Sequence, residues 1–341
     1  MSETGIPNCT NTCFMNASFQ MLYSMEEFRN QIMNIVLEIE ILNGLDQKDI
    51  TVIKKVKALK KIFELMASEK SWGVYKGTNA NAYNEGEPRG ELIKAKTELI
   101  QIISKASGGG HVEDLGSQQD ATEFINSLLD MIHTFESMVP HTVNREISNF
   151  YYVNQETKTY CKKDDKVEKV EEVTNSEEQN LINLSFNGKK DIENAIAEEE
   201  KVVKVDTLDK CRHLNNSTND EYNSYSKMTL TIPETNKYVI IALKRFENKI
   251  TRVVDASFNV NHEVVIDGKI YSLTGAVLHS GLTTNSGHYI YQTYDKGNVL
   301  KTYNDDSIGN REDGSDDMTL NLNSYVLLYK RLEGEASAPA A

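Results

Sequence analysis

The stretch at residues 5–16 reads GIPNCTNTCFMN, and apolar residues at three- and four-residue spacing follow it. From Thr12 onward the apolar residues are Phe14, Ala17, Met21, Leu22, Met25 and Phe28. This spacing predicts an amphipathic helix that begins near Asn11 or Thr12, either of which can cap it. Cys13 then lies in the first turn, beside the positive end of the helix dipole, which favours a thiolate. Taken alone, a cysteine in this position is more often a small buried residue.

A thiolate nucleophile needs a base and a group that orients the base, and both are usually distant in the sequence. Two histidines near the end of the chain are candidates, His279 and His288. His288 follows a glycine and begins a β-type run, so its ring can project from a strand edge. Further on, Asn304 and Asp305 offer an amide and a carboxylate that can orient an imidazole. The order Cys, His, Asn/Asp is that of papain-like enzymes, but a lone histidine at a strand start more often has a structural role.

The rest of the chain divides into a helical first part and a β-rich second part. Apolar periodicity predicts helices at 50–66 and 92–103 and another that begins at 117–120, with a loop at 73–90. From Ile147 onward, β-branched and aromatic runs predict strands at 150–153, 181–186, 228–232, 238–246, 271–278, 288–294 and 325–329. Within 154–223, the charged stretches 162–178 and 191–204 predict a polar, partly mobile insertion and not a second core.

Composition limits the classes of partner. The 341 residues carry a formal net charge of −14, whereas phosphate binding needs a basic surface, so we expect no nucleic-acid partner. The acidic balance favours a partner that carries lysines and arginines, or serves solubility alone. Hydrophobic residues make up 39% of the chain, which is enough for a sizeable core.

The cysteines and the start of the chain bear on the compartment. Four cysteines, widely spaced, are too few for a disulfide scaffold. We see no basic and apolar leader pattern, and no run of about 18 apolar residues that could span a membrane. We therefore expect a cytoplasmic protein, with the nucleus as the alternative, that has free thiols and no membrane partner.

Five motifs, taken in order, resemble those of the ubiquitin-specific proteases. Residues 5–16 resemble the Cys box of that family, which reads roughly GLxNxGNTCYMN, and residues 118–124 (QQDATEF) resemble its QQDAxEF helix. Residues 243–246 (LKRF) match a family strand, and residues 325–331 (YVLLYKR) resemble its closing strand. Residues 279–281 (HSG), 287–289 (GHY) and 303–308 (YNDDSI) are similar to its His box. The set spans Gly5 to Arg331, nearly the whole chain.

The resemblance implies an α+β fold, that of a papain-like cysteine protease of the ubiquitin-specific protease type. It predicts one catalytic domain over 1–332, with a helical thumb over about 1–145. Fingers-like strands with the charged insertion, reduced in this chain, then occupy about 146–240, and a β-rich palm about 238–332. The tail at 333–341 is predicted to be disordered.

The resemblance also assigns catalytic roles. Cys13 is the nucleophile, and His288 deprotonates it and later protonates the leaving lysine amine. Asn304 falls on the position that holds the imidazole, although Asp305 supplies charge there or takes the orienting role itself. Asn8 falls on the oxyanion position, where its side-chain amide and the Cys13 backbone N–H would donate to the tetrahedral intermediate.

Four further residues are implied in substrate binding. Asp120 and Glu123 lie three residues apart on one helix face that would meet the basic C-terminal tail of ubiquitin. Gly287, next to His288, suits a narrow channel for the Gly-Gly end of ubiquitin, and Tyr289 would line that channel. The predicted partners are ubiquitin and ubiquitinated proteins, and we expect a monomer without a cofactor.

Two departures from the family pattern qualify these expectations. Thr10 replaces the usual glycine, and a β-branched residue is strained if that position needs positive φ. Where many members carry two CxxC pairs for a structural zinc, this chain has only Cys161, Cys211 and His213, so we predict no metal. Two alternatives stay open: a protease for another ubiquitin-like modifier, and a catalytically weak ubiquitin-binding scaffold.

Overall fold

The computed structural model describes most of the chain. It covers residues 5–8, 11–35, 46–68, 88–106, 118–138, 147–163, 169–205, 211, 222–247, 251–283, 286–310 and 317–332. Within these ranges, no helix is both long and apolar enough to cross a membrane. Cys9, Thr10, the predicted tail at 333–341 and most of the predicted loop at 73–90 lie outside the described residues, and residues 88–90 of that loop begin a helix.

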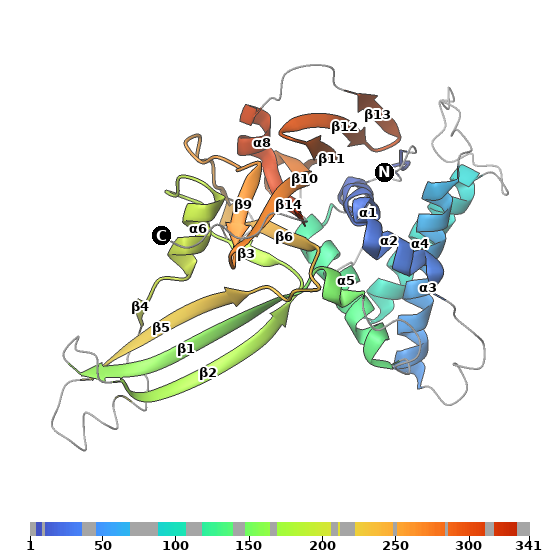
Figure 1. Ribbon diagram of the computed structural model, residues 1–341. Helices are drawn as coiled ribbons and strands as arrows, with labels where there is room; N and C mark the ends of the chain where they lie inside the picture. Colours follow the sequence, from blue (N-terminus) through green and yellow to red (C-terminus); the bar gives the residue numbers. More distant parts are fainter. Residues whose placement is uncertain are drawn as a thin grey trace.

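Five helices form one side of the molecule (Figure 1). They are α1 (Cys13–Ser24), α2 (Glu26–Asn34), α3 (Gln47–Ala67), α4 (Pro88–Ala106) and α5 (Ala121–Met138). The predicted helices are confirmed, but the one expected through Phe28 breaks at Met25, whose backbone is extended. The Tyr238 hydroxyl accepts the Glu26 backbone N–H at 2.9 Å, so the new helix start has a tertiary partner for one of its unpaired donors.

An eight-stranded sheet packs against these helices. Its path runs β13 (Ser307–Asn310), β12 (Asn298–Asn304), β11 (Ser286–Asp295), β10 (Lys269–Thr283), β14 (Ser324–Arg331), β6 (Tyr238–Leu243) and β3 (Ile182–Leu184), and β9 (Glu263–Ile266) also pairs with β10. Only the β3–β6 pair is parallel. One hydrophobic cluster joins α1, α3, α4 and α5 to one face of the sheet, and a second lies on the other face. Helix α1 is buried almost throughout, which is why its apolar residues extend beyond a single stripe.

A second sheet projects from the body as a long ribbon (Figure 1). Its order is β2 (Lys169–Gln179), β1 (Val153–Lys163), β5 (Tyr222–Thr231) and β4 (Val203–Val205), all antiparallel. It corresponds to the predicted fingers. Other short elements are the 3-10 turn Ser148–Phe150, the hairpin β7 (Phe246–Glu247) with β8 (Thr251–Arg252), and α8 (Asp317–Asn323).

The expectation of a partly mobile insertion is wrong for the described residues of 154–223. The charged stretch 162–178 contributes to strands β1 and β2, because paired antiparallel strands satisfy each other's backbone groups while polar side chains face solvent on both sides. The stretch 191–204 forms α6 (Ile192–Glu199) and β4. The Asp191 side chain caps α6 by accepting the Asn194 N–H at 2.9 Å. Ile192 joins the second hydrophobic cluster, so this segment does contribute to a core.

The expectation of free thiols is also wrong for two of the four cysteines. Cys161 on β1 forms a disulfide with Cys211, fifty residues further along the chain. The residue opposite Cys161 on β5 is Ser224, and its hydroxyl lies 3.0 Å from the Cys211 sulfur. Strand pairing brings these groups together, which the spacing of cysteines along the sequence could not indicate. The compartment of the protein stays a prediction.

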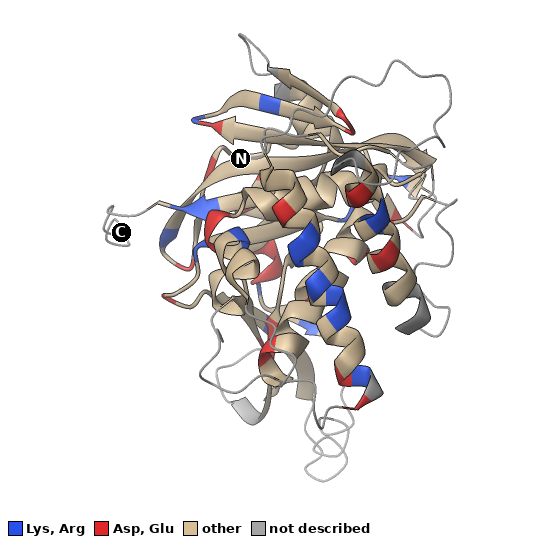
Figure 2. Ribbon diagram, turned by 90° about the vertical axis from the view of Figure 1, so that its right-hand side faces the viewer, with Lys and Arg blue, Asp and Glu red and all other residues tan. Residues whose placement is uncertain are grey.

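The negative charge of the chain is distributed unevenly. Seen from the helical side, a run of blue marks lysines of the long helices (Figure 2). Helix α3 alone carries Lys48, Lys54, Lys55, Lys57, Lys60 and Lys61. An excess of carboxylates must therefore lie elsewhere in the chain.

Candidate active site

The Cys13 thiol lies at the start of α1. Thr12 is the N-cap, with φ −97°, and Cys13 is the first residue of the helix, as the sequence predicted. The Cys13 side chain is 3% exposed. Helix α1 thus places a buried thiol in its first turn, at the positive end of the helix dipole.

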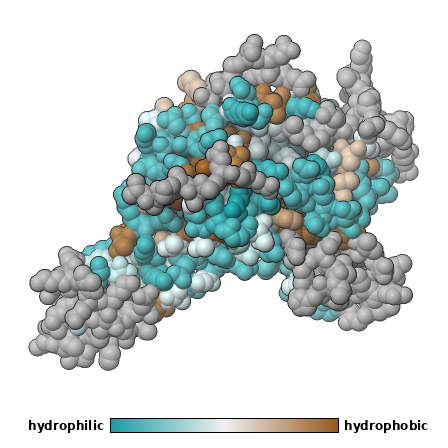
Figure 3. Space-filling model, viewed as in Figure 1, coloured by the Kyte–Doolittle hydropathy of each residue, from teal (hydrophilic) through white to brown (hydrophobic). Residues whose placement is uncertain are grey.

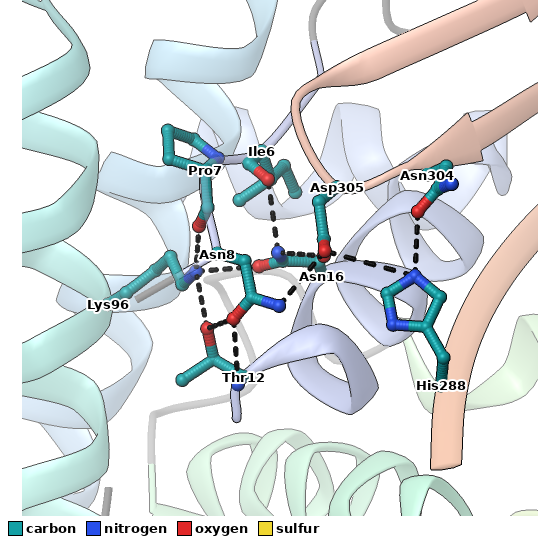
Figure 4. Close-up of polar contacts among 9 residues, drawn as sticks. All are labelled: Ile6, Pro7, Asn8, Thr12, Asn16, Lys96, His288, Asn304 and Asp305. Carbon is teal, nitrogen blue, oxygen red and sulfur yellow. Dashed lines mark hydrogen bonds and ion pairs between the residues drawn. The ribbon is translucent and has the colours of Figure 1, made fainter. Parts of the chain in front are cut away.

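The His288 imidazole bridges Cys13 and Asn304. His288 lies on β11, and its Nε2 is 2.6 Å from Oδ1 of Asn304, at the end of β12 (Figure 4). The His288 pKa is raised to about 9, first by a hydrogen bond to the Cys13 side chain and then, against the opposing effect of burial, by Asn304. Because Asn304 occupies Nε2, Nδ1 is the ring nitrogen left for the thiol.

Asp305 hydrogen-bonds the segment before the nucleophile and forms an ion pair with the imidazole. It lies in the turn between β12 and β13 with φ 53°, a left-handed conformation that Asp tolerates better than most residues. Its Oδ2 accepts the Asn8 Nδ2–H at 2.9 Å and its Oδ1 accepts the Asn16 Nδ2–H at 2.7 Å (Figure 4). Its Oδ2 also lies 3.9 Å from Nε2 of His288, which is an ion-pair contact beyond hydrogen-bond distance, and its charge helps to raise the His288 pKa. Asn304 therefore makes the hydrogen bond to the imidazole, whereas Asp305 adds charge beside the ring and hydrogen-bonds two asparagine amides.

The Asn8 amide is oriented from both ends. Its Oδ1 accepts the Thr12 backbone N–H at 3.0 Å and the Thr12 hydroxyl at 3.1 Å, while its Nδ2 donates to Asp305. The Ile6 N–H also donates to the Asp305 carbonyl at 2.7 Å, which ties this segment to the β12–β13 turn. A Cβ on Gly5 would lie 2.4 Å from the Asp306 carbonyl oxygen, so only glycine permits this approach.

Two glycines meet beside His288. Gly281 on β10 and Gly287 on β11 approach so closely that a Cβ on Gly287 would lie 2.5 Å from the Ser280 carbonyl and 2.7 Å from Nε2 of His279. Gly287 has φ +140°, which also favours glycine. Gly281 and Gly287 leave the backbone next to His288 without side chains, which a narrow channel would need. The channel itself stays a prediction.

Buried aromatic side chains pack next to Gly281 and Gly287, since the His279 ring lies close to both glycines. The Tyr289 ring is 1% exposed and packs against His279, with centroids 4.3 Å apart, and against Tyr325. Burial, with the Arg252 guanidinium and His288, lowers the His279 pKa to about 4, so His279 is neutral at ordinary pH. Tyr289 was predicted to line the channel. This role stays a prediction, because the Tyr289 ring is buried against His279 and Tyr325.

Asp120 and Glu123 border a pocket next to the site. Asp120 precedes α5, where its Oδ1 accepts the Thr122 and Glu123 N–H groups and its Oδ2 accepts the Tyr325 hydroxyl. Burial raises the Asp120 pKa. The pocket, about 220 Å³, is lined by Asp120, Thr122, Glu123, Asn183, Ala242, Leu243, Lys244, Arg245, Phe246 and Tyr325. Asp120 is thus largely a helix cap, while Glu123 is exposed.

Three residues of this site lay outside the sequence-based prediction. Asn16 was part of the quoted Cys-box motif and received no role. Lys96 interrupts the apolar face formed by Leu92 and Leu99 on α4, and this was the available signal. Arg252 donates to the carbonyl oxygens of His279 and Gly281 and to the Leu322 carbonyl, and nothing near it in the sequence indicated this.

The donor set does not fit a structural zinc site. Cys161 and Cys211 are bonded to each other and have no thiolate to offer. Among the residues that the structure describes, no group of three or more His, Cys, Asp or Glu side chains could hold a metal ion.

A helix-borne thiol that faces a strand-borne imidazole, with an amide behind the ring, is the arrangement of papain-like thiol proteases. The family model of ubiquitin carboxyl-terminal hydrolase matches residues 4–329. The chain belongs to this family. It has the α+β fold and the deubiquitinase class that the five motifs led us to expect.

Solved structures agree in fold. The SAGA DUB module of Ubp8, Sgf11, Sus1 and Sgf73 bound to monoubiquitin is similar over 97% of this chain and 70% of that chain, with a TM-score of 0.68 and 19% identity. The module bound to ubiquitin aldehyde has a TM-score of 0.66 over the same shares, also at 19% identity. A yeast SAGA DUB module has a TM-score of 0.66 over 97% and 69%, at 18% identity. No curated protein sequence matches the chain.

Proposed function

We propose that this deubiquitinase hydrolyses the isopeptide or peptide bond after the C-terminal Gly-Gly of ubiquitin, with Cys13 as its nucleophile. The observation that carries the proposal is the His288 ring, which contacts Asn304 at 2.6 Å and whose pKa the Cys13 side chain raises, in a chain of this family. Below the His288 pKa of about 9, an imidazolium beside the sulfur stabilises a thiolate, the nucleophilic form.

The chemistry follows from these contacts. The Cys13 thiolate attacks the carbonyl carbon after the Gly-Gly end, and the carbonyl oxygen becomes an oxyanion. The Asn8 side-chain amide has two N–H groups. One donates to Asp305, and the other would donate to the oxyanion. Imidazolium His288 gives its proton to the leaving lysine amine, and a thioester to Cys13 remains. Neutral His288 then removes a proton from water, which attacks the thioester and releases the carboxylate.

The pockets next to the site support a basic, extended substrate tail. Glu123 borders both the 220 Å³ pocket and a second one of about 360 Å³ that Asp130 and Glu178 also line. Carboxylates thus line a path between α5 and the sheets, where they attract lysine and arginine side chains. The bare backbone at Gly281 and Gly287 suits a tail that ends in two glycines.

Release of a fluorophore from the C-terminus of ubiquitin tests the proposal. We expect turnover by the wild type and none by Cys13→Ala, which should still bind ubiquitin. Faster release from another ubiquitin-like modifier than from ubiquitin would identify a protease for that modifier. Binding without turnover by the wild type would identify a scaffold, and turnover that survives in Cys13→Ala would refute the assignment of the nucleophile.

We further propose that the chain is a monomer in the cytoplasm or nucleus. The face in Figure 3 supports a monomer, because its described surface is mainly hydrophilic and its hydrophobic atoms occur in small separate groups. Light scattering on the purified chain tests it, and a mass of twice 38.5 kDa would contradict a monomer.

A further inference from the structure

Lys96 is a buried cation at the centre of the site's support. It lies on α4, and it is 2% exposed, whereas lysines are almost never fully buried unless their ammonium group has partners. The ammonium group donates to the Pro7 carbonyl at 2.8 Å, to Oδ1 of Asn16 at 2.6 Å and to the Thr12 hydroxyl at 3.4 Å (Figure 4). Pro7 and Thr12 belong to the segment that surrounds Asn8 and leads into Cys13, and Asn16 lies on α1 after Cys13.

Asn16 connects this cation to the carboxylate of Asp305. Its Oδ1 faces the Lys96 ammonium, and its Nδ2 donates to Oδ1 of Asp305 and to the Ile6 carbonyl at 3.0 Å. An amide has a negative oxygen and a positive N–H end, so a cation on one side and an anion on the other select this orientation over the flipped one. The flipped amide would point oxygen at carboxylate and N–H at ammonium.

The same cation reaches Asn8 by two further routes. Lys96 holds the carbonyl of Pro7, the residue directly before Asn8. It also contacts the Thr12 hydroxyl, which donates to Oδ1 of Asn8. Asn8 itself donates to Asp305, so Lys96 acts on both ends of the Asn8 side chain through intermediates. These contacts lead from Lys96 to Asn8, so the effect of Lys96 should fall on the oxyanion donor.

We propose that Lys96 is a positioning residue that holds the Asn8 amide in place for the oxyanion, through Pro7, Thr12 and Asn16. This inference rests on the proposed function. It predicts that Lys96 contributes to the steps in which an oxyanion forms and contributes little to the reactivity of the Cys13–His288 pair. Burying a charge without partners is costly. Here the Lys96 ammonium group orders polar groups of Pro7, Thr12 and Asn16 and, through Thr12, the Asn8 amide.

Kinetics of Lys96→Met test the proposal, because Met keeps the length of the side chain and removes the ammonium. We expect kcat on the ubiquitin reporter to fall by about tenfold to a hundredfold, as with partial loss of an oxyanion donor, and KM to change little. Alkylation of Cys13 by iodoacetamide forms no oxyanion, so its rate should stay near that of the wild type. Lys94→Met, an exposed lysine on the same helix, is the matched control and should match the wild type in both assays.

A double-mutant cycle with Asn8→Ala separates positioning from stability. If Lys96 acts through Asn8, Lys96→Met should cost much less in the Asn8→Ala background than in the wild type. Equal costs in both backgrounds, an unchanged kcat, or equal losses of turnover and alkylation would each refute the proposal. Lys96→Gln replaces Lys96→Met under the same criteria if the Met variant does not fold. An inactive wild type would refute the proposed function itself, and the Cys13→Ala comparison makes that outcome distinct.

Discussion

Asn304→Ala removes the amide oxygen that lies 2.6 Å from Nε2 of His288 and leaves the Cys13 side of the ring unchanged. A hydrogen bond to a charged group contributes about 1.5–3 kcal/mol. The His288 side chain is 42% exposed, so solvent screens this contact and the lower end of that range applies. That value corresponds to about a tenfold loss of rate, and loss of ring orientation adds to it, since general-base catalysis contributes about 10²–10⁴. We expect kcat to fall by about a hundredfold.

The pH profile gives a second measure of the same change. The His288 pKa is raised to about 9, so its imidazolium is present below about pH 9 and is lost as the pH rises through that value. Asn304 is one of the groups that raise this pKa, and its removal should move the alkaline limb of kcat/KM to lower pH, by about one unit. The alkaline step in the pH profile of Cys13 alkylation should move with it, because loss of the same imidazolium changes the surroundings of the sulfur.

Asp305→Asn is the comparison variant. Both carboxylate oxygens of Asp305 accept hydrogen bonds, whereas an amide at this position can accept only through its single oxygen. Turnover should fall by about tenfold, with a smaller shift of the alkylation limb. A larger loss of turnover from Asp305→Ala than from Asn304→Ala, or a larger pH shift from Asp305→Asn, would show that Asp305 orients the imidazole and would refute this reasoning.

Three further outcomes are expected. Glu123→Lys reverses the charge on the rim of both pockets, so KM for the ubiquitin reporter should rise by about tenfold while kcat stays, and an unchanged KM would exclude Glu123 from substrate binding. Gly287→Ala places a Cβ 2.5 Å from the Ser280 carbonyl and should lower kcat/KM by more than about a hundredfold. Gly309→Ala, with no atom within 4 Å of the added Cβ, is the control and should behave as wild type. Similar activity of the two variants would contradict the narrow channel beside Gly287. Cys211→Ser opens the bond across fifty residues and should lower the free energy of unfolding in urea by about 2–4 kcal/mol, and a wild type whose unfolding is insensitive to reductant would show that the disulfide does not form.

The sequence was sufficient for the elements that depend on local pattern. Apolar spacing after Thr12 predicted α1 and put Cys13 in its first turn, because helix periodicity and capping act within a few residues. The order of the five motifs indicated the family that the model match confirms. The motif register favoured Asn304 over Asp305 as the residue that holds the imidazole; Asn304 contacts Nε2 of His288 at 2.6 Å, and its orienting role stays a prediction.

Tertiary structure was needed wherever the contact closes a long loop. Nothing local distinguishes the two charged stretches from solvated coil, because strand pairing and the packing of α6 make them regular. The Cys161–Cys211 bond depends on the register of β1 with β5. Asn304 ends a strand whereas Asp305 adopts φ 53° in the turn, so Asn304 hydrogen-bonds the imidazole while Asp305 hydrogen-bonds two asparagine amides. Lys96 on α4 meets Asn16 on α1 only because both helices pack into one core, where an ammonium group must find acceptors.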